Sequence, residues 1–207
     1  MKIIFLDIDG VLNCEEGYRS GECEYKEAPG FRYQGFYSPS KHLINKLIDE
    51  TEAKVVISSS WRKDGLHRMQ QIWKAEGMSG EVIDTTPSLY LQSNGSIRFW
   101  NGQESKHPTP KIRGYSIPRG CEIQYWLKDR GFYHINWSKE EQDKYLISSG
   151  VQNYVIIDDD SDMLYGQRNN FVHVYPSPRN IEGFSHSHYQ KAKEILSKTV
   201  TEITYGK

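Results

Sequence analysis

Short apolar runs, each followed by polar residues, recur along the chain. Between these runs, apolar residues return every three or four positions, which is typical of amphipathic helices. Strands that alternate with helices indicate a parallel sheet covered on both faces. The strands are expected at 3–6, 54–58, 81–84, 154–157 and 171–175, and the helices around 43–48, 66–73, 123–127 and 192–196.

Local signals predict where the helices begin and end. Ser38-Pro39 is typical of a helix start, and Gly77 and Gly131 are typical of helix ends. Two spacings resemble capping boxes. They predict a short helix from Ser138 to Glu141 onward, and a C-terminal helix opened by Ser187 and Gln190.

Three segments interrupt this alternation. Residues 13–37 have no helical period and predict a long loop or flap. Residues 87–118 contain four prolines and predict an irregular insertion, in which Asn94-Gly95 favours a β-hairpin. Residues 132–150 form a third insertion. We therefore expect one domain over residues 1–207 with these insertions.

The composition limits the classes of function. The 207 residues carry a formal net charge of −1, which argues against a polybasic nucleic-acid module but leaves room for a local basic groove. Aromatic residues make up 13% of the chain, so we expect a folded protein. Three sparse cysteines, and a start too short in apolar residues for a signal peptide, predict a cytoplasmic location with no membrane span.

Polar side chains collect where three of the predicted strands end. Asp7-Ile8-Asp9-Gly10 follows the first strand, Ser58-Ser59-Ser60-Trp61-Arg62 the second, and Asp158-Asp159-Asp160 a later one. The carboxyl ends of parallel strands share one edge, where ligands bind. Clustered carboxylates favour a hard cation such as Mg²⁺, and hydroxyls with free N–H groups suit phosphate. The sequence thus predicts a metal site beside a phosphate site.

These segments resemble motifs of the haloacid dehalogenase (HAD) superfamily of phosphotransferases. Asp7–Leu12 resembles the first motif, Val55–Ser58 the second, and Tyr154–Asp159 the fourth. The third motif usually supplies a lysine, but here Arg119 stands before a helix, with Lys111 as its rival. The combination of DIDGVLN, ISSSWR and DDD is similar to the HAD domains found beside RNA-repair and polynucleotide-modifying modules.

The resemblance implies a three-layer α/β/α, Rossmann-like HAD fold with a mostly parallel sheet and a small cap or none. It implies that Asp7 is the nucleophile, forming an aspartyl-phosphate, and that Asp9 is the general acid and base. Residues i and i+2 of an extended segment point the same way, so Asp7 and Asp9 can share a site.

The resemblance also implies the ligands. Mg²⁺ is expected on the Asp7 carboxylate, the Asp9 backbone carbonyl and a carboxylate of Asp158 or Asp159. The phosphate is expected on Arg119 and on Ser58, with Ser59 as the alternative register; Trp61 either packs or contacts the substrate.

In the superfamily that the chain resembles, a large cap usually closes over small substrates, and the insertions here are too short for such a cap. The resemblance therefore implies an open site that suits a bulky phosphate, such as a nucleic-acid end. The flap aromatic residues allow two interpretations, a small core that holds the flap or a surface that stacks bases. Two other functions remain open, a phospho-acceptor or binding module without catalysis and a metal-dependent nuclease. The acid two residues after Asp7 favours the phosphatase, because receiver domains need none there.

Overall fold

The computed structural model describes residues 1–91, 97–100, 115–128, 150–175 and 181–198. The helix predicted from Ser138, the helix end at Gly131 and the rival cation Lys111 lie outside this part of the chain. Among the residues described, no helix has the length and apolar character needed to cross a membrane.

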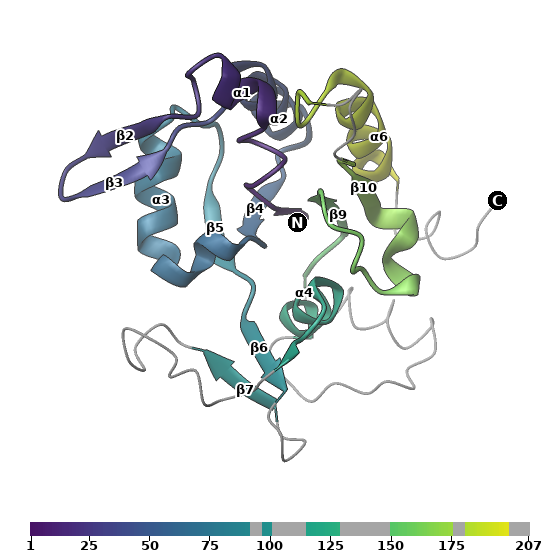
Figure 1. Cartoon of the computed structure of the whole chain (residues 1–207). Coiled ribbons are helices and arrows are strands. Elements are labelled where there is room, and N and C mark those ends of the chain that lie inside the picture. Colours follow the sequence, from purple (N-terminus) through teal and green to yellow (C-terminus); the bar gives the residue numbers. More distant parts are fainter. Residues whose placement is uncertain (92–96, 101–114, 129–149, 176–180, 199–207) are drawn as a thin grey trace.

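A parallel sheet forms the centre of the molecule (Figure 1). Its strands are β1 (Lys2–Leu6), β4 (Lys54–Ile57), β5 (Val82–Thr85), β9 (Asn153–Asp158) and β10 (Phe171–His173). Their order is β10-β9-β1-β4-β5, and each neighbouring pair is parallel. The α/β class predicted from the alternating pattern is confirmed. Strands β9, β1 and β4 lie side by side, so their carboxyl ends are adjacent.

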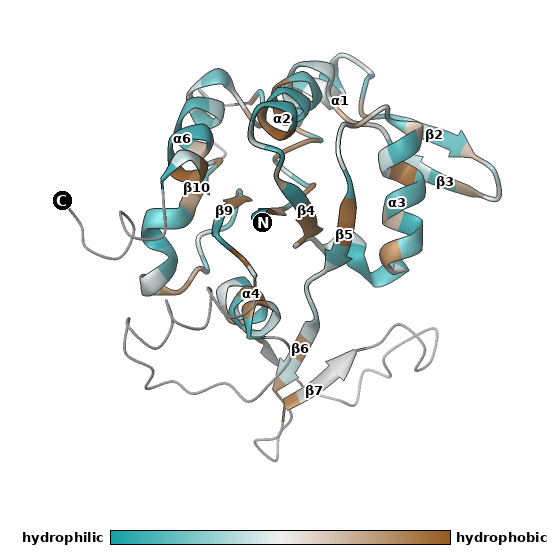
Figure 2. Ribbon diagram, turned by 180° about the vertical axis from the view of Figure 1, so that it is seen from behind, coloured by the Kyte–Doolittle hydropathy of each residue, from teal (hydrophilic) through white to brown (hydrophobic). Residues whose placement is uncertain are grey.

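Alternation along β1 divides the core into two layers. Ile4 and Leu6 belong to the larger cluster, whereas Ile3 and Phe5 belong to the smaller one on the opposite face. The larger cluster is covered by α2 (Ser38–Thr51), α3 (Leu66–Ala75) and α6 (His186–Ser197), and the smaller one by α4 (Arg119–Leu127). Figure 2 shows the hydrophobic strand residues enclosed between helices whose outward faces are hydrophilic.

Two helix starts differ from the prediction. Helix α2 already includes Ser38, and Tyr37 is its N-cap. Helix α6 begins after Ser185 rather than Ser187, so the predicted capping box was wrong. The physical reason is that His188 takes the third helical position, where its Nδ1 accepts the Ser185 backbone N–H at 3.1 Å.

Residues 13–37 are more regular than predicted. They form α1 (Glu15–Arg19) and a hairpin of β2 (Tyr25–Ala28) and β3 (Phe31–Gln34). Gly30, at φ +83°, makes the turn between these strands, a conformation that glycine adopts without strain. The expectation of a long loop was therefore wrong, because these residues form a short helix and a hairpin.

The flap aromatic residues fall into two groups. Tyr33 and Phe36 are buried, and Lys26 of β2 pairs with the buried Glu76 at 2.8 Å. These contacts hold the hairpin against the body of the domain, as the packing interpretation expected. Tyr18 and Tyr25, in contrast, remain 45% and 63% exposed.

The second insertion also contains strands. Strands β6 (Ser88–Leu91), β7 (Ile97–Trp100) and β8 (Tyr115–Ser116) form a small antiparallel sheet, in the order β7-β6-β8. Leu91 pairs with Ile97, which confirms the predicted hairpin. The expectation of an irregular segment is wrong for this part, because the alternating residues beside the hairpin turn pair as strands.

Candidate active site

The central strands carry three candidate residues to one edge of the sheet. Asp7 directly follows β1, and its N–H donates to the Ile157 carbonyl at 2.9 Å. Ser58 follows β4 and donates its N–H to the Leu6 carbonyl at 2.8 Å. Asp158 is the last residue of β9. Sheet hydrogen bonds thus fix the backbone on which the site is built.

Asp7, Asp158 and Asp159 form a tight cluster, here called the inner acids. Their carboxylate oxygens lie within 4.8 Å of one another. Asp7 and Asp158 are only 5% and 1% exposed. The Asp160 N–H donates to Asp158 Oδ1 at 2.9 Å, but Asp158 Oδ2 has no hydrogen-bond partner among the described residues. Arg119 Nε lies 3.7 Å from this oxygen.

Burial and mutual repulsion disfavour charge on the inner acids. Burial raises the pKa of Asp7 well above its ordinary value, and the charge of Asp158 raises it further, while Arg119 and a hydrogen bond from Ser59 oppose the shift. Burial also raises the pKa of Asp158 to about 7 and, together with Asp160, raises that of Asp159. The unpartnered Asp158 oxygen and the all-carboxylate donor set fit a hard divalent cation.

Gly10 allows Asp159 to approach the loop after β1. Its φ is +72°, and a Cβ at this position would lie 2.3 Å from Asp159 Oδ2. Any other residue would therefore be strained in its backbone and would collide with an inner acid. This close approach gives Gly10 a second role besides the turn.

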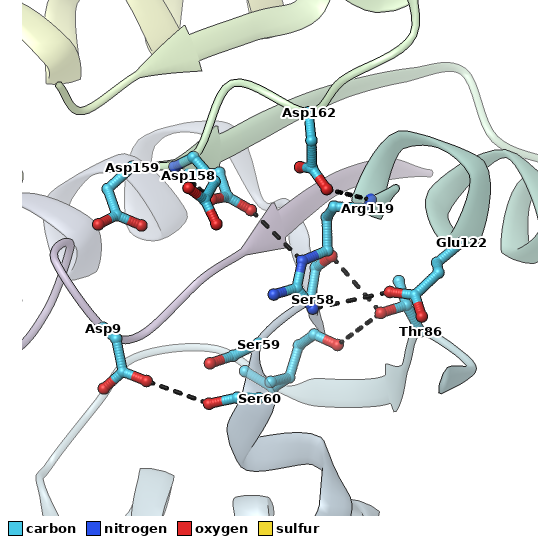
Figure 3. A network of polar contacts seen from close by, with 12 residues as sticks. Asp9, Ser58, Ser59, Ser60, Thr86, Arg119, Glu122, Asp158, Asp159 and Asp162 are labelled. Carbon is cyan, nitrogen blue, oxygen red and sulfur yellow. Dashed lines mark hydrogen bonds and ion pairs between the residues drawn. The ribbon is translucent and has the colours of Figure 1, made fainter. Parts of the chain in front are cut away.

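Asp9 lies near the inner acids but has different surroundings (Figure 3). Its Oδ1 accepts hydrogen bonds from Trp61 Nε1 at 3.0 Å and from Asn13 Nδ2 at 3.1 Å. Its Oδ2 accepts one from Ser60 Oγ at 3.1 Å. The Asp9 carboxylate is not a member of the inner cluster, and the metal contact expected of its backbone carbonyl stays a prediction.

The serines after β4 point in different directions. Ser58 is fully buried, with the Thr86 hydroxyl 3.5 Å from its own. Ser59 is also buried and hydrogen-bonds Asp7, while its Oγ accepts the Trp61 N–H at 3.4 Å. Ser59 thus lies beside Asp7, and Ser58 lies at the end of β4, the strand next to β1. The choice between the two serines as phosphate ligand stays open.

Arg119 begins α4 beside the inner acids. Its backbone N–H donates to Asp162 Oδ2 at 2.8 Å, which fixes the start of the helix. Its guanidinium lies 3.7 Å from both Asp158 and Glu122 (Figure 3). Gly120 lets α4 approach closely, because a Cβ there would lie 2.4 Å from the Leu164 nitrogen. The structure thus places Arg119 at the site, while its rival Lys111 lies outside the described residues.

A buried ion pair between Arg62 and Glu122, which was not predicted, braces this region. Arg62 Nη2 lies 2.5 Å from Glu122 Oε2, and Arg62 Nη1 donates to the Ser59 carbonyl at 2.9 Å. Glu122 also accepts the Leu89 N–H at 2.9 Å, although burial raises its pKa to about 7. Arg62 Nε donates to Ser88 Oγ at 3.0 Å, so one guanidinium connects the serine loop, α4 and β6. Glu122 stands one helical turn after Arg119, a spacing that would have been a usable signal.

Trp61, Ser60 and Asn13 were also not foreseen as partners of Asp9. The sequence offered packing or substrate contact for Trp61, and the ring does pack against the core, 6.1 Å from Phe36. Its indole N–H has a further partner in Asp9. The only sequence signal for these contacts was that Ser60 and Trp61 lie just after the end of a strand.

The parallel sheet, the DxDG turn after β1 and the paired acids after β9 define an α/β domain of the HAD class, whose known functions include phosphoester chemistry. The family model described as "HAD domain in Swiss Army Knife RNA repair proteins" matches residues 3–187, and the chain belongs to this family. The resemblance inferred from the motifs is thereby confirmed. No curated protein and no solved structure gave a significant match.

Proposed function

We propose that this chain is a Mg²⁺-dependent phosphomonoester hydrolase that acts through an aspartyl-phosphate on Asp7. The observation that carries the proposal is the contrast between two acids separated by one residue. Asp7 is buried among acids that need a cation, whereas Asp9 is held by neutral donors from the protein. This contrast suits a nucleophile beside a metal and a separate group that exchanges a proton.

The reaction has two steps. A carboxylate oxygen of Asp7 attacks phosphorus, the bond from phosphorus to the ester oxygen breaks, and Asp9 gives its proton to that oxygen. Asp9, now ionised, then takes a proton from water, whose oxygen attacks the phosphorus of the aspartyl-phosphate. The bond to Asp7 breaks, so inorganic phosphate is released and both acids return to their starting states.

The inner acids are the proposed cation ligands, together with the Asp9 carbonyl. When bound, Mg²⁺ would offset repulsion between the carboxylates and the phosphate. Arg119 and the hydroxyls of Ser58 or Ser59 are the proposed phosphate contacts. Arg119 Nε lies 3.7 Å from Asp158, so its charge reaches the same space.

The proposed substrate is a nucleic-acid end or another bulky phosphate monoester. The family description refers to RNA repair proteins, and the chain carries exposed aromatic residues on the first insertion. The Arg32 guanidinium lies 5.3 Å from the ring centre of Tyr25, a combination of cation and ring that suits bases and phosphates.

A screen of phosphomonoesters with Mg²⁺ tests this function, and it should include oligonucleotides with 3′- and 5′-phosphates. The wild type should release many equivalents of phosphate per protein, and Asp7→Asn should release none. Release that stops at one equivalent would instead indicate a phospho-acceptor. Cleavage of internally labelled oligonucleotides would indicate a nuclease. Undiminished turnover by Asp7→Asn would exclude the proposed nucleophile.

A further inference from the structure

The three donors around Asp9 come from two separate segments of the chain. Trp61 and Asn13 both donate to Oδ1, at 3.0 and 3.1 Å, and Ser60 donates to Oδ2, at 3.1 Å. We propose that Trp61 and Asn13 are positioning residues that orient Asp9, so that Oδ2, paired with Ser60, is the oxygen that exchanges the proton. This inference rests on the proposed phosphatase function.

The chemistry of the donors distinguishes the two oxygens of Asp9. An indole N–H and an amide NH₂ can only donate, so Oδ1 faces two donors, Trp61 and Asn13, in this structure. A proton on Oδ1 would face these two donors. The Ser60 hydroxyl can donate to an ionised Oδ2 or accept from a protonated one. Oδ2 can therefore gain and lose a proton without losing its partner.

The indole of Trp61 is held firmly enough to act as a fixed donor. Trp61 lies in the short helix η1 (Ser60–Asp64), and its ring packs against the main core near Phe36. Two hydrogen bonds to Ser59 hold the start of this helix. Ser59 Oγ accepts the Trp61 backbone N–H, and the Arg62 side chain donates to the Ser59 carbonyl. A rigid donor fixes the plane of the carboxylate that it binds.

Asn13 provides independent support, because fold stability does not explain it. Asn13 is 1% exposed, and its Oδ1 has no hydrogen-bond partner among the described residues. A buried amide oxygen without a partner destabilises a folded protein. The amide is satisfied only on the side that faces Asp9, as expected of a residue that serves the site.

Leaving-group dependence tests the positioning role, because a proton matters most when the leaving oxygen is basic. With an alkyl phosphate, Trp61→Phe should lower kcat by roughly 10–100-fold, a part of the 10²–10⁴-fold that acid catalysis supplies. With p-nitrophenyl phosphate, whose leaving group needs no proton, the loss should stay below about threefold. KM should change little for either substrate.

Trp126→Phe is the matched control. Trp126 Nε1 donates to Asp84 Oδ2 at 2.8 Å, so this variant also loses an indole-to-carboxylate hydrogen bond, but one that does not involve Asp9. It should affect the alkyl and aryl substrates equally. Equal losses on both substrates in Trp61→Phe would overturn the positioning role.

A spectrum of the indole N–H groups tests the contact without measuring activity. The Trp61 cross-peak in a ¹H–¹⁵N correlation spectrum is identified by its loss in Trp61→Phe. Asp9→Asn should shift this peak and leave that of Trp126 in place; an unmoved Trp61 peak would overturn the inference. If the wild type hydrolyses no phosphomonoester, the proposed function fails, and the positioning role of Trp61 in catalysis fails with it, even if the peak shifts.

Discussion

The inner acids and Asp9 lie in one site but have opposite surroundings. Asp158 Oδ2 is buried with no hydrogen-bond donor among the described residues, whereas both oxygens of Asp9 accept hydrogen bonds. Aspartate carboxylates in one site thus have two different environments. The inner acids have the surroundings expected of a cation site, whereas Asp9 is held by hydrogen bonds from the protein itself.

The difference arises from where the strand stops. Asp7 still hydrogen-bonds β9 through its backbone, so its side chain stays with the acids at the sheet edge. Asp9 lies in the turn that Gly10 closes, next to Asn13 and within reach of the loop after β4. A single intervening residue therefore separates a buried acidic environment, the proposed metal site, from one in which neutral donors hold the carboxylate.

The largest expected effect is that of Asp7→Asn on turnover. An amide cannot act as the nucleophile, so phosphate release should fall by more than about a thousandfold. The fold should persist, because the substitution also removes one of three repelling charges. Steady-state phosphate release and the thermal midpoint measure the two effects. Turnover within tenfold of the wild type would mean that Asp7 and Asp9 have been assigned the wrong roles.

The second effect is stabilisation by Mg²⁺, which should depend on the inner acids and not on the Asp9 side chain. A ligand at about 100 times its Kd adds about 2.7 kcal/mol to the free energy of unfolding. Mg²⁺ should therefore raise the thermal midpoint of the wild type at pH 8, and EDTA should reverse the shift. Calorimetric or fluorescence melting curves measure this shift.

Two matched variants sharpen this test of the metal. Asp158→Asn should lose most of the Mg²⁺-dependent shift, because it removes an inner carboxylate. Asp9→Asn should keep it, since the Asp9 carboxylate is outside the cluster. A shift lost equally in both variants would show that the two environments are not separate.

The third effect is the pH dependence of the stability of the metal-free protein, whose sign follows from the raised pKa of Asp158. The pKa of Asp158 is raised from 3.8 to about 7 by burial, so the folded state binds more protons than the unfolded state between these values. The stability that this group contributes is full below pH 3.8 and is lost as the pH rises through 7. The slope is about 1.4 kcal/mol per pH unit for one proton.

Urea unfolding in EDTA at pH 5 and pH 8 measures this slope. Other groups titrate too, so the informative quantity is the difference between wild type and Asp158→Asn. The variant should lose less stability than the wild type between pH 5 and pH 8. Identical losses would mean that the Asp158 carboxylate is not held in a buried, cation-deficient position.

The sequence predicted the parts of the site that lie at strand ends. Asp7, Ser58 and Asp158 each follow or end an apolar run, and parallel strands bring such positions together whatever the details of packing. The strand pattern also predicted the sheet, because β1, β4 and β9 are buried on both faces and appear as continuous apolar runs.

The rest depended on contacts between distant side chains. The pair of Arg62 with Glu122 joins residues 60 positions apart, and Trp61 reaches Asp9 across 52 positions. Neither contact follows from the periodicity of a helix or strand. The sequence pattern therefore does not predict which side chains pair. The hairpin of the first insertion was missed for another reason, since its strands are short and largely polar on the exposed face.

The smallest expected effect is that of Asn13→Leu on stability, and it separates function from folding. The variant removes a buried amide oxygen that has no hydrogen-bond partner among the described residues, so the free energy of unfolding should change by less than about 1 kcal/mol. Asn153→Leu is the matched control, because this equally buried amide donates to the Ile195 and Lys198 carbonyls and accepts the Tyr154 N–H. Its loss leaves several groups unpaired and should cost about 3 kcal/mol. Urea unfolding compares the two variants; equal destabilisation would show that Asn13 serves the fold rather than the orientation of Asp9.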